Sequence, residues 1–189
     1  MAVKALMRAG DVPGLPVVCI DSGEDVAEIR DVIYDGAEHK LHGFTLNKRG
    51  LLAGRLKQVL LIENCTAIGA DAVMINTVAN LTAQEEAGDV VSPKNAVHVI
   101  GNRVMSANGS DLGEIIGVVI ETDGEPSAVG YEVKKADSKE TRFIPITEQM
   151  TISGENLLVP AELEPFITND LAGFGASVAT YRSGQLRGE

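Results

Sequence analysis

Tryptophan is absent from this 189-residue chain, and aromatic residues together make up only 4% of it. Few rings are therefore available to stack on nucleobases or sugars. The formal net charge is -11 at pH 7, and an acidic surface repels phosphate backbones and anionic lipid headgroups. Nucleic acid is thus an unfavourable partner. We interpret the one local gathering of positive charge as charges that flank an apolar loop: Lys48, Arg49, Arg55 and Lys57.

Cysteine is scarce as well, since Cys19 and Cys65 are the only two and neither belongs to a CxxC motif. This usage is typical of buried thiols in a reducing compartment, with a disulfide or a reactive thiol as the alternatives.

The N-terminus lacks the apolar core of a signal peptide, and no apolar run is long enough to span a membrane as a helix. We therefore expect a cytoplasmic protein without a membrane span.

Motifs that carry catalysis are missing too. The sequence has no Gly-rich phosphate loop, no HExxH and no Gly-x-Ser-x-Gly, which predicts a protein that is not an enzyme and uses no cofactor. His39 and His42 lie near the start of a predicted strand, and residues three apart point to opposite faces of a strand unless a bulge intervenes. We expect no metal site there. Acidic residues around Asp21 and around Glu121 are interpreted as solvated turns rather than as Ca²⁺ ligands.

What the chain does contain is an internal repeat. Residues 17–34 and 104–120 both combine a short apolar strand, a glycine turn and a longer strand. Ser-Gly-Glu-Asp-Val-Ala-Glu-Ile in the first copy overlays Asn-Gly-Ser-Asp-Leu-Gly-Glu-Ile in the second. The later segments correspond as well, with 60–75 matching 141–159. Short strands rich in Val and Ile predict an all-β chain, and a small barrel would remove the exposed sheet edges of each copy.

Two strands of the first copy allow predictions about burial. The run from Val17 to Ile20 is continuously apolar, so we expect it to be buried on both sides. Residues 40–47 alternate with period two, which places His42, Phe44 and Leu46 on one face.

These features resemble the PRC-barrel family, small β-barrels found in the H subunit of photosynthetic reaction centres and in the C-terminal part of a ribosome maturation factor. The second copy carries the pattern in Gly-Asn-Arg-Val at 101–104, Asn-Gly at 108–109, Leu-Gly-Glu-Ile at 112–115, Phe-Ile-Pro-Ile at 143–146 and Ser-Gly at 153–154. The first copy departs from it with Ala27 in place of a glycine and Leu61 in place of the second copy's Pro145. The resemblance implies two tandem barrels that dock onto other macromolecules, without family-wide catalytic residues.

The predicted organisation has four parts: a first barrel over residues 1–78, a linker over 79–98, a second barrel over 99–165 and a C-terminal tail over 166–189. In the linker, Thr82 followed by Glu85 has the form of a helix cap.

The tail has apolar residues at helical spacing, but Gly173 and Gly175 interrupt them. It is therefore either a marginal amphipathic helix or an extended arm laid over a barrel.

The loop that follows residue 47 is apolar at Leu51 and Leu52, whereas its counterpart at 136–140 is wholly polar. An exposed apolar tip marks a contact site, and packing against its own barrel or into the groove between the barrels is the alternative. The predicted partner-contact residues lie in this loop and in the tail: Leu51, Leu52, Phe166, Leu171, Phe174 and Tyr181.

The predicted function is therefore non-enzymatic protein–protein interaction or scaffolding, with a partner protein or a second copy of the chain. One alternative is a ribosome- or RNA-associated factor. The other is a protein that binds a small ligand or a metal in the groove between the barrels.

Overall fold

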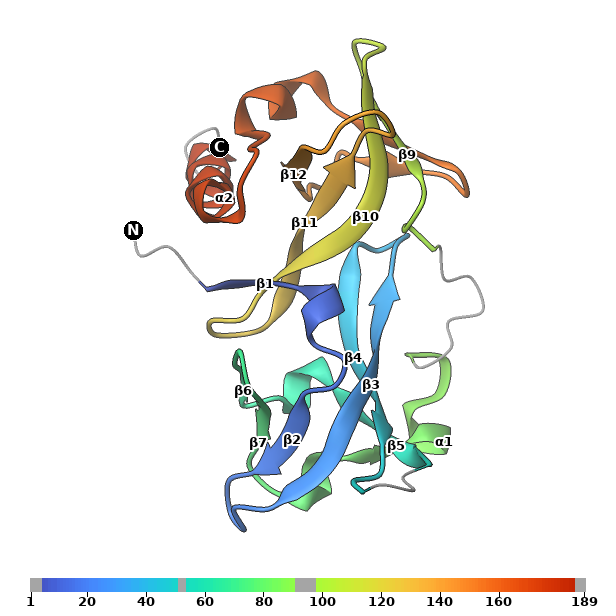
Figure 1. The fold of residues 1–189 in the computed structure, drawn as a ribbon, viewed down its shortest axis with the longest axis vertical. Helices are drawn as coiled ribbons and strands as arrows, with labels where there is room; N and C mark the ends of the chain where they lie inside the picture. The colour runs from blue at the N-terminus through green and yellow to red at the C-terminus, as the bar shows by residue number, and fades with distance from the viewer. Residues whose placement is uncertain (1–4, 51–53, 91–97, 186–189) are drawn as a thin grey trace. The chain divides into compact units, whose positions relative to one another are not determined.

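The computed structural model describes residues 5–50, 54–90 and 98–185, and the chain divides into two compact units (Figure 1). The unit that we call the N-terminal unit comprises residues 7–96 and 122–127. The unit that we call the C-terminal unit comprises residues 1–6, 97–121 and 128–189. Leu51 and Leu52 lie outside the described residues.

The sheet of the N-terminal unit has seven strands in the order β6-β7-β2-β3-β4-β5-β8. Their bounds are β2 Pro16–Cys19, β3 Asp25–Asp35, β4 Lys40–Asn47, β5 Arg55–Leu61, β6 Ala67–Ile68, β7 Val73–Ile75 and β8 Thr82–Ala83. Strands β2 and β7 run parallel, and every other neighbouring pair is antiparallel. The long β3 therefore forms a meander with β4 and β5, while β7 returns to the open side of β2.

The C-terminal unit repeats this arrangement in the order β12-β11-β10-β9-β14-β13, with β1 (Leu6–Arg8) paired to β10. Its other strands are β9 Arg103–Ser106, β10 Asp111–Glu121, β11 Ser127–Lys134, β12 Thr141–Pro145, β13 Thr151–Ile152 and β14 Asn156–Val159. Strands β9 and β14 are again the parallel pair. Val104 pairs with Leu157 here just as Val17 pairs with Val73 in the N-terminal unit. The same pairing in both units confirms the internal repeat and the all-β class.

Neither sheet closes into a cylinder among the described residues, because each strand order runs from one edge to the other without pairing the two edges. Three of the four edge strands, β6, β8 and β13, have only two residues each, and the fourth, β12, has five residues and pairs with Thr168 through an isolated bridge. Such short edges expose few unpaired backbone groups, so little is gained by closing the sheet. The expected closed barrels are therefore corrected to open sheets.

Burial along β2 differs from the expectation. Val17 and Cys19 are buried, Pro16 and Val18 are half-buried, and Ile20 just beyond the strand is 50% exposed. The continuous apolar run thus has one core face, because the sheet is covered on one side only at this position.

A bulge in β4 changes the predicted alternation. Ile33 pairs with Gly43 and Tyr34 pairs with Leu41, so His42 is an extra residue on its strand. Phe44 is buried as predicted, but Leu41 is buried in place of His42, which is half-exposed. The period-two prediction fails at the bulge and holds beyond it.

Residues 79–90 of the stretch predicted as a linker (79–98) belong to the N-terminal unit, and residue 98 belongs to the C-terminal unit. Thr82 of β8 pairs with Val59 of β5, and the one-turn helix α1 (Gln84–Ala87) lies against β5 and β8. The predicted cap at Thr82 is not present, because the N-cap of α1 is Ala83 and no side chain caps this helix. The 3₁₀ helix before it (Val78–Asn80) is capped by Thr77, whose hydroxyl accepts a hydrogen bond from the Ala79 amide at 3.0 Å. Ala87 is buried, so these residues complete the sheet instead of joining two domains.

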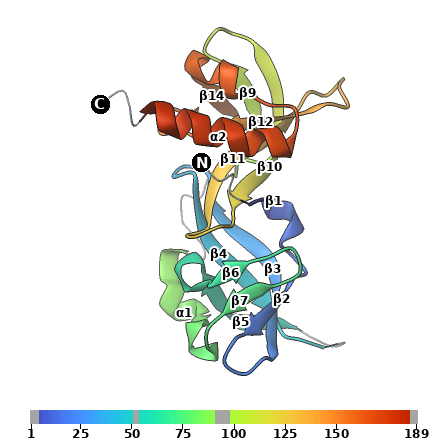
Figure 2. The same ribbon diagram turned by 90° about the vertical axis from the view of Figure 1, so that its left-hand side faces the viewer.

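The tail is a helix, α2 (Leu171–Gln185), which lies against β12 (Figure 2). Before it, a 3₁₀ helix (Ala161–Phe166) leads to an isolated bridge between Thr168 and Phe143. Phe143 occupies on β12 the place that Val59 occupies on β5, and Thr168 the place of Thr82. The repeat thus includes a 3₁₀ turn, a strand pairing and a helix in both units.

Packing explains why α2 forms despite its glycines. The Phe174 ring lies so close to Gly130 that a Cβ there would overlap its Cζ atom. The Asp170 carboxylate accepts a hydrogen bond from the Gly173 amide at 2.7 Å and satisfies a free donor of the first turn. Tertiary contacts and this bond outweigh the low helix propensity of glycine.

Candidate interaction site

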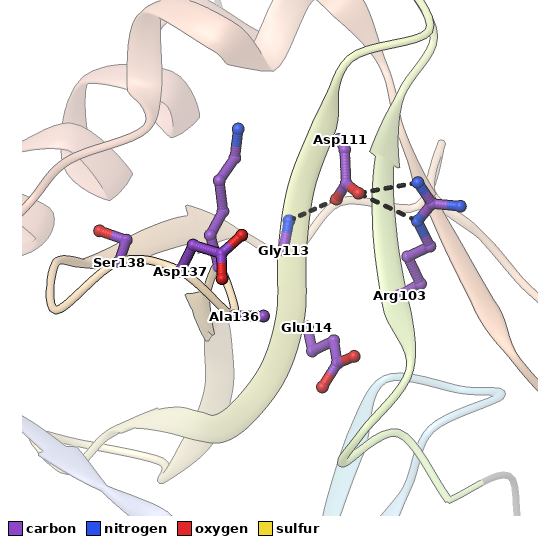
Figure 3. A pocket seen from close by; sticks show the side chains of 8 residues that line it. Arg103, Asp111, Gly113, Glu114, Ala136, Asp137 and Ser138 are labelled. Atoms are coloured by element: carbon purple, nitrogen blue, oxygen red, sulfur yellow. Dashed lines mark hydrogen bonds and ion pairs between the residues drawn. The ribbon is translucent and has the colours of Figure 1, made fainter.

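The C-terminal unit has a surface cleft of about 320 Å³ where the start of β10 meets the loop after β11 (Figure 3). Arg103 comes from β9, and Lys135 is the first residue of the loop. The residues that line the cleft are Arg103, Asp111, Gly113, Glu114, Lys135, Ala136, Asp137 and Ser138. We call this set the charged cleft.

Arg103 and Asp111 form the fixed part of the charged cleft. The Arg103 guanidinium donates to Asp111 Oδ2 from Nη2 at 2.7 Å and from Nε at 3.2 Å, while the Gly113 amide donates to Asp111 Oδ1 at 2.9 Å. These hydrogen bonds hold the pKa of Asp111 below its ordinary value, and those from Arg103 have the largest effect. Both oxygens of this carboxylate are therefore engaged within the unit.

Gly113 is the residue that lets the loop approach β10. It has a φ of +118°, and a Cβ there would overlap the carbonyl oxygen of Lys134. Only glycine accepts this backbone conformation together with so close a neighbour. The glycine in the overlaid Leu-Gly-Glu-Ile segment thus determines where the wall of the cleft lies.

The remaining charges of the cleft give it a negative excess. Apart from the Arg103–Asp111 pair, the cleft is lined by one further basic residue, Lys135, and two further acidic residues, Glu114 and Asp137. Two strands away from Asp111 in the same sheet, Leu158 of β14 lies opposite Met105 and is 48% exposed. The sheet therefore exposes an apolar side chain in addition to the charges of the cleft.

The same place in the N-terminal unit is organised by Arg49. Its guanidinium donates to Asp25 at 2.8 Å and to Glu28 at 3.3 Å, and these acids overlay Asp111 and Glu114. The Lys48 amide donates a hydrogen bond to the Gly54 carbonyl at 3.0 Å, which joins the two ends of the loop. Arg49 therefore pairs with acidic residues of β3, whereas the sequence had indicated only a charge that flanks an apolar loop.

The tail residues predicted as contacts are largely packed within the C-terminal unit. Phe174 is fully buried in a cluster with Val119 and Phe143, and its ring centroid lies 5.8 Å from that of Phe143. The prediction of Phe174 as a contact residue is therefore wrong. Its position on the inner face of α2 points it into the core.

The other three tail residues are half-buried. Leu171 packs against the same core cluster. Phe166 and Tyr181 contact each other edge to face, with ring centroids 5.2 Å apart. Only part of the surface of these three side chains is therefore accessible to a partner.

Both cysteines are free thiols, Cys19 buried and Cys65 half-buried. Burial raises the pKa of the Cys65 thiol to about 12. The prediction of a buried thiol is confirmed for Cys19.

The charged cleft was missed in the sequence because its charges come from three separate segments. The available signal was the wholly polar loop at 136–140 combined with the glycine at 113, which together imply a loop folded back onto the neighbouring strand.

Comparison with known families agrees with this architecture. A model of the PRC-barrel domain matches residues 5–82 and 95–162. Since these segments make up most of the chain, the protein belongs to the PRC-barrel family. No curated protein matches the sequence significantly. Among the described residues, no helix has the length and apolar character needed to cross a membrane.

Proposed function

We propose that this protein is a non-enzymatic interaction module that binds a partner protein through the charged cleft. The observation that carries the proposal is the gathering of Lys135, Glu114 and Asp137 in one cleft, on a sheet that also exposes Leu158. Charges around an apolar contact are typical of protein interfaces, in which a polar rim surrounds a drier centre. Membership of the PRC-barrel family supports the same role.

The partner surface is expected to be basic. The cleft has a carboxylate excess once the Arg103–Asp111 pair is set aside, and the whole chain carries a net charge of -11. Opposite charge on the partner would steer the encounter and raise the association rate, an effect that salt screens. Arg103 and Asp111 hold the wall in place, while Glu114 and Asp137 supply the attraction.

The test begins with affinity purification from the native cells, followed by binding measurements with the purified partner. We expect Glu114→Lys with Asp137→Lys to weaken binding by roughly tenfold or more, mainly through a slower association rate. Glu148→Lys changes an exposed charge of the same unit outside the cleft and serves as the matched control. Equal weakening by the control, or no weakening by the cleft variant, would contradict the proposal.

The loop at Leu51 and Leu52 is the second proposed contact. Replacing both leucines by Asp is expected to abolish partner capture while the melting temperature hardly changes, because an exposed apolar tip contributes little to folding. A large fall in the melting temperature would show that these leucines are core residues. Sedimentation of the purified chain alone decides whether a second copy is the partner instead.

A further inference from the structure

Three metal-ligand side chains converge on the hairpin between β3 and β4 of the N-terminal unit. Asp35, Glu38 and His42 each offer one ligand atom, and these atoms all lie within 4.8 Å of one another. Asp35 is 8% exposed, His42 is half-buried and Glu38 is exposed. The group therefore has a buried end and an open end.

The local backbone brings these side chains together. The bulge makes His42 an extra residue on β4, so strict alternation no longer fixes its face. Asp35 Oδ1 accepts a hydrogen bond from the Ala37 amide at 2.8 Å, which fixes the carboxylate at the start of the turn. Glu38 follows within the same turn. The sequence-based argument against a metal site assumed strict alternation along this strand, and the bulge at His42 breaks that alternation.

The sister repeat shows what a buried carboxylate at this position binds. Strands β3 and β10 both have eleven residues and begin at the overlaid Asp25 and Asp111, so Asp35 corresponds to Glu121. The Glu121 side chain is 3% exposed and accepts a hydrogen bond from Arg182 Nη1 at 2.7 Å. A guanidinium on α2 thus supplies positive charge to the buried carboxylate of the C-terminal unit.

Helix α1 of the N-terminal unit, Gln84–Ala87, carries no basic residue. Helix α1 ends at Ala87 after one turn, whereas α2 continues for two turns beyond Phe174 to reach Arg182. In place of the guanidinium, a second carboxylate and an imidazole lie next to Asp35. Two carboxylates this close repel each other, and a bound cation would relieve that repulsion. The His39 imidazole of the same turn also interacts electrostatically with Asp35.

We propose that Asp35, Glu38 and His42 bind a divalent transition-metal ion of the Zn²⁺ type. Two carboxylate oxygens and one imidazole nitrogen suit Zn²⁺, whereas Mg²⁺ and Ca²⁺ prefer oxygen ligands alone. Ligand atoms around a tetrahedral zinc lie roughly 3.4 Å apart, so only small rotations of the side chains are needed to close the site. Exposed Glu38 marks the side where water would complete the coordination. The ion would clamp the hairpin as Arg182 clamps its counterpart.

The test titrates ZnCl₂ into the full metal-free chain by calorimetry and follows the melting temperature in parallel. We expect one equivalent to bind and to raise the melting temperature, because an ion that binds only the folded state stabilises it. Glu38→Gln and His42→Asn should each weaken binding by roughly tenfold or more. MgCl₂ in place of ZnCl₂ should give no comparable effect.

Matched controls remove one similar group elsewhere. Glu86→Gln takes an exposed carboxylate from α1, and His98→Asn takes an exposed imidazole from the C-terminal unit. Both should bind Zn²⁺ like the unmodified chain. Absence of zinc binding, or unchanged affinity in Glu38→Gln and His42→Asn, overturns the proposal. Because Glu38 is exposed, Glu38→Gln is expected to fold normally even if substitution of Asp35 unfolds the hairpin.

Discussion

Removal of Arg182 should destabilise the C-terminal unit more than substitution of an exposed residue usually does. Its guanidinium lies 2.7 Å from Glu121 Oε2, and the Glu121 side chain is only 3% exposed. Breaking a buried ion pair from one side costs about 3–5 kcal/mol, because the other charge remains buried. Since Arg182 itself is 47% exposed, water screens part of the interaction, and we expect Arg182→Met to lower the free energy of unfolding by about 2–3 kcal/mol.

Urea unfolding followed by far-UV circular dichroism measures this loss, and amide hydrogen exchange along β10 and α2 locates it in the C-terminal unit. The double variant Glu121→Gln with Arg182→Met should recover most of the stability, because no charge is left buried. Arg103→Met is the control: its pair with Asp111 is 56% and 46% exposed, so solvent screens it and its loss is expected to change the free energy of unfolding far less. A loss in Arg182→Met no larger than in the control, or a double variant less stable than Arg182→Met, would refute the reasoning.

Two further predictions concern the N-terminal unit. Gly43→Ala should destabilise it by about 2 kcal/mol or more, since φ is +150° and the new Cβ would overlap the carbonyl oxygen of Leu60; Gly54→Ala, with no neighbour within 4 Å, is the control, and equal urea midpoints would contradict the prediction. The Cys65 thiol, with its pKa raised to about 12 by burial, should stay protonated and react slowly with iodoacetamide near about pH 8. Rapid native-state labelling, at the rate seen in urea, would show that the thiol is accessible and ionised.

The strands and their pairing could be predicted from the sequence because they depend on local patterns that occur twice. Gly23 and Gly109 lie at overlaid turns and both adopt positive φ, +72° and +82°, so the turn residues locate both hairpins. The overlay of Asp25 with Asp111 then gives the register of the long strands.

Other features could not be predicted, because they depend on contacts distant in sequence. The bulge at His42 and the burial of Phe174 follow from how a strand meets its neighbour and how α2 packs on β12, neither of which leaves a periodic signal. The charged cleft needs residues from β9, β10 and the loop after β11. Charged residues look alike in sequence whether they are solvated or gathered at one place.

A recombinant fragment of the second half should include the Thr168–Phe143 pairing and the helix that follows it. A recombinant fragment that stops at residue 162, where the family match ends, would lack the side chains that cover Val119 and Phe143. It would also leave the Glu121 carboxylate without Arg182. Such a fragment is expected to aggregate, whereas one extended to Gln185 keeps Phe174 and Val178 in the core and still lacks β1 with Leu6.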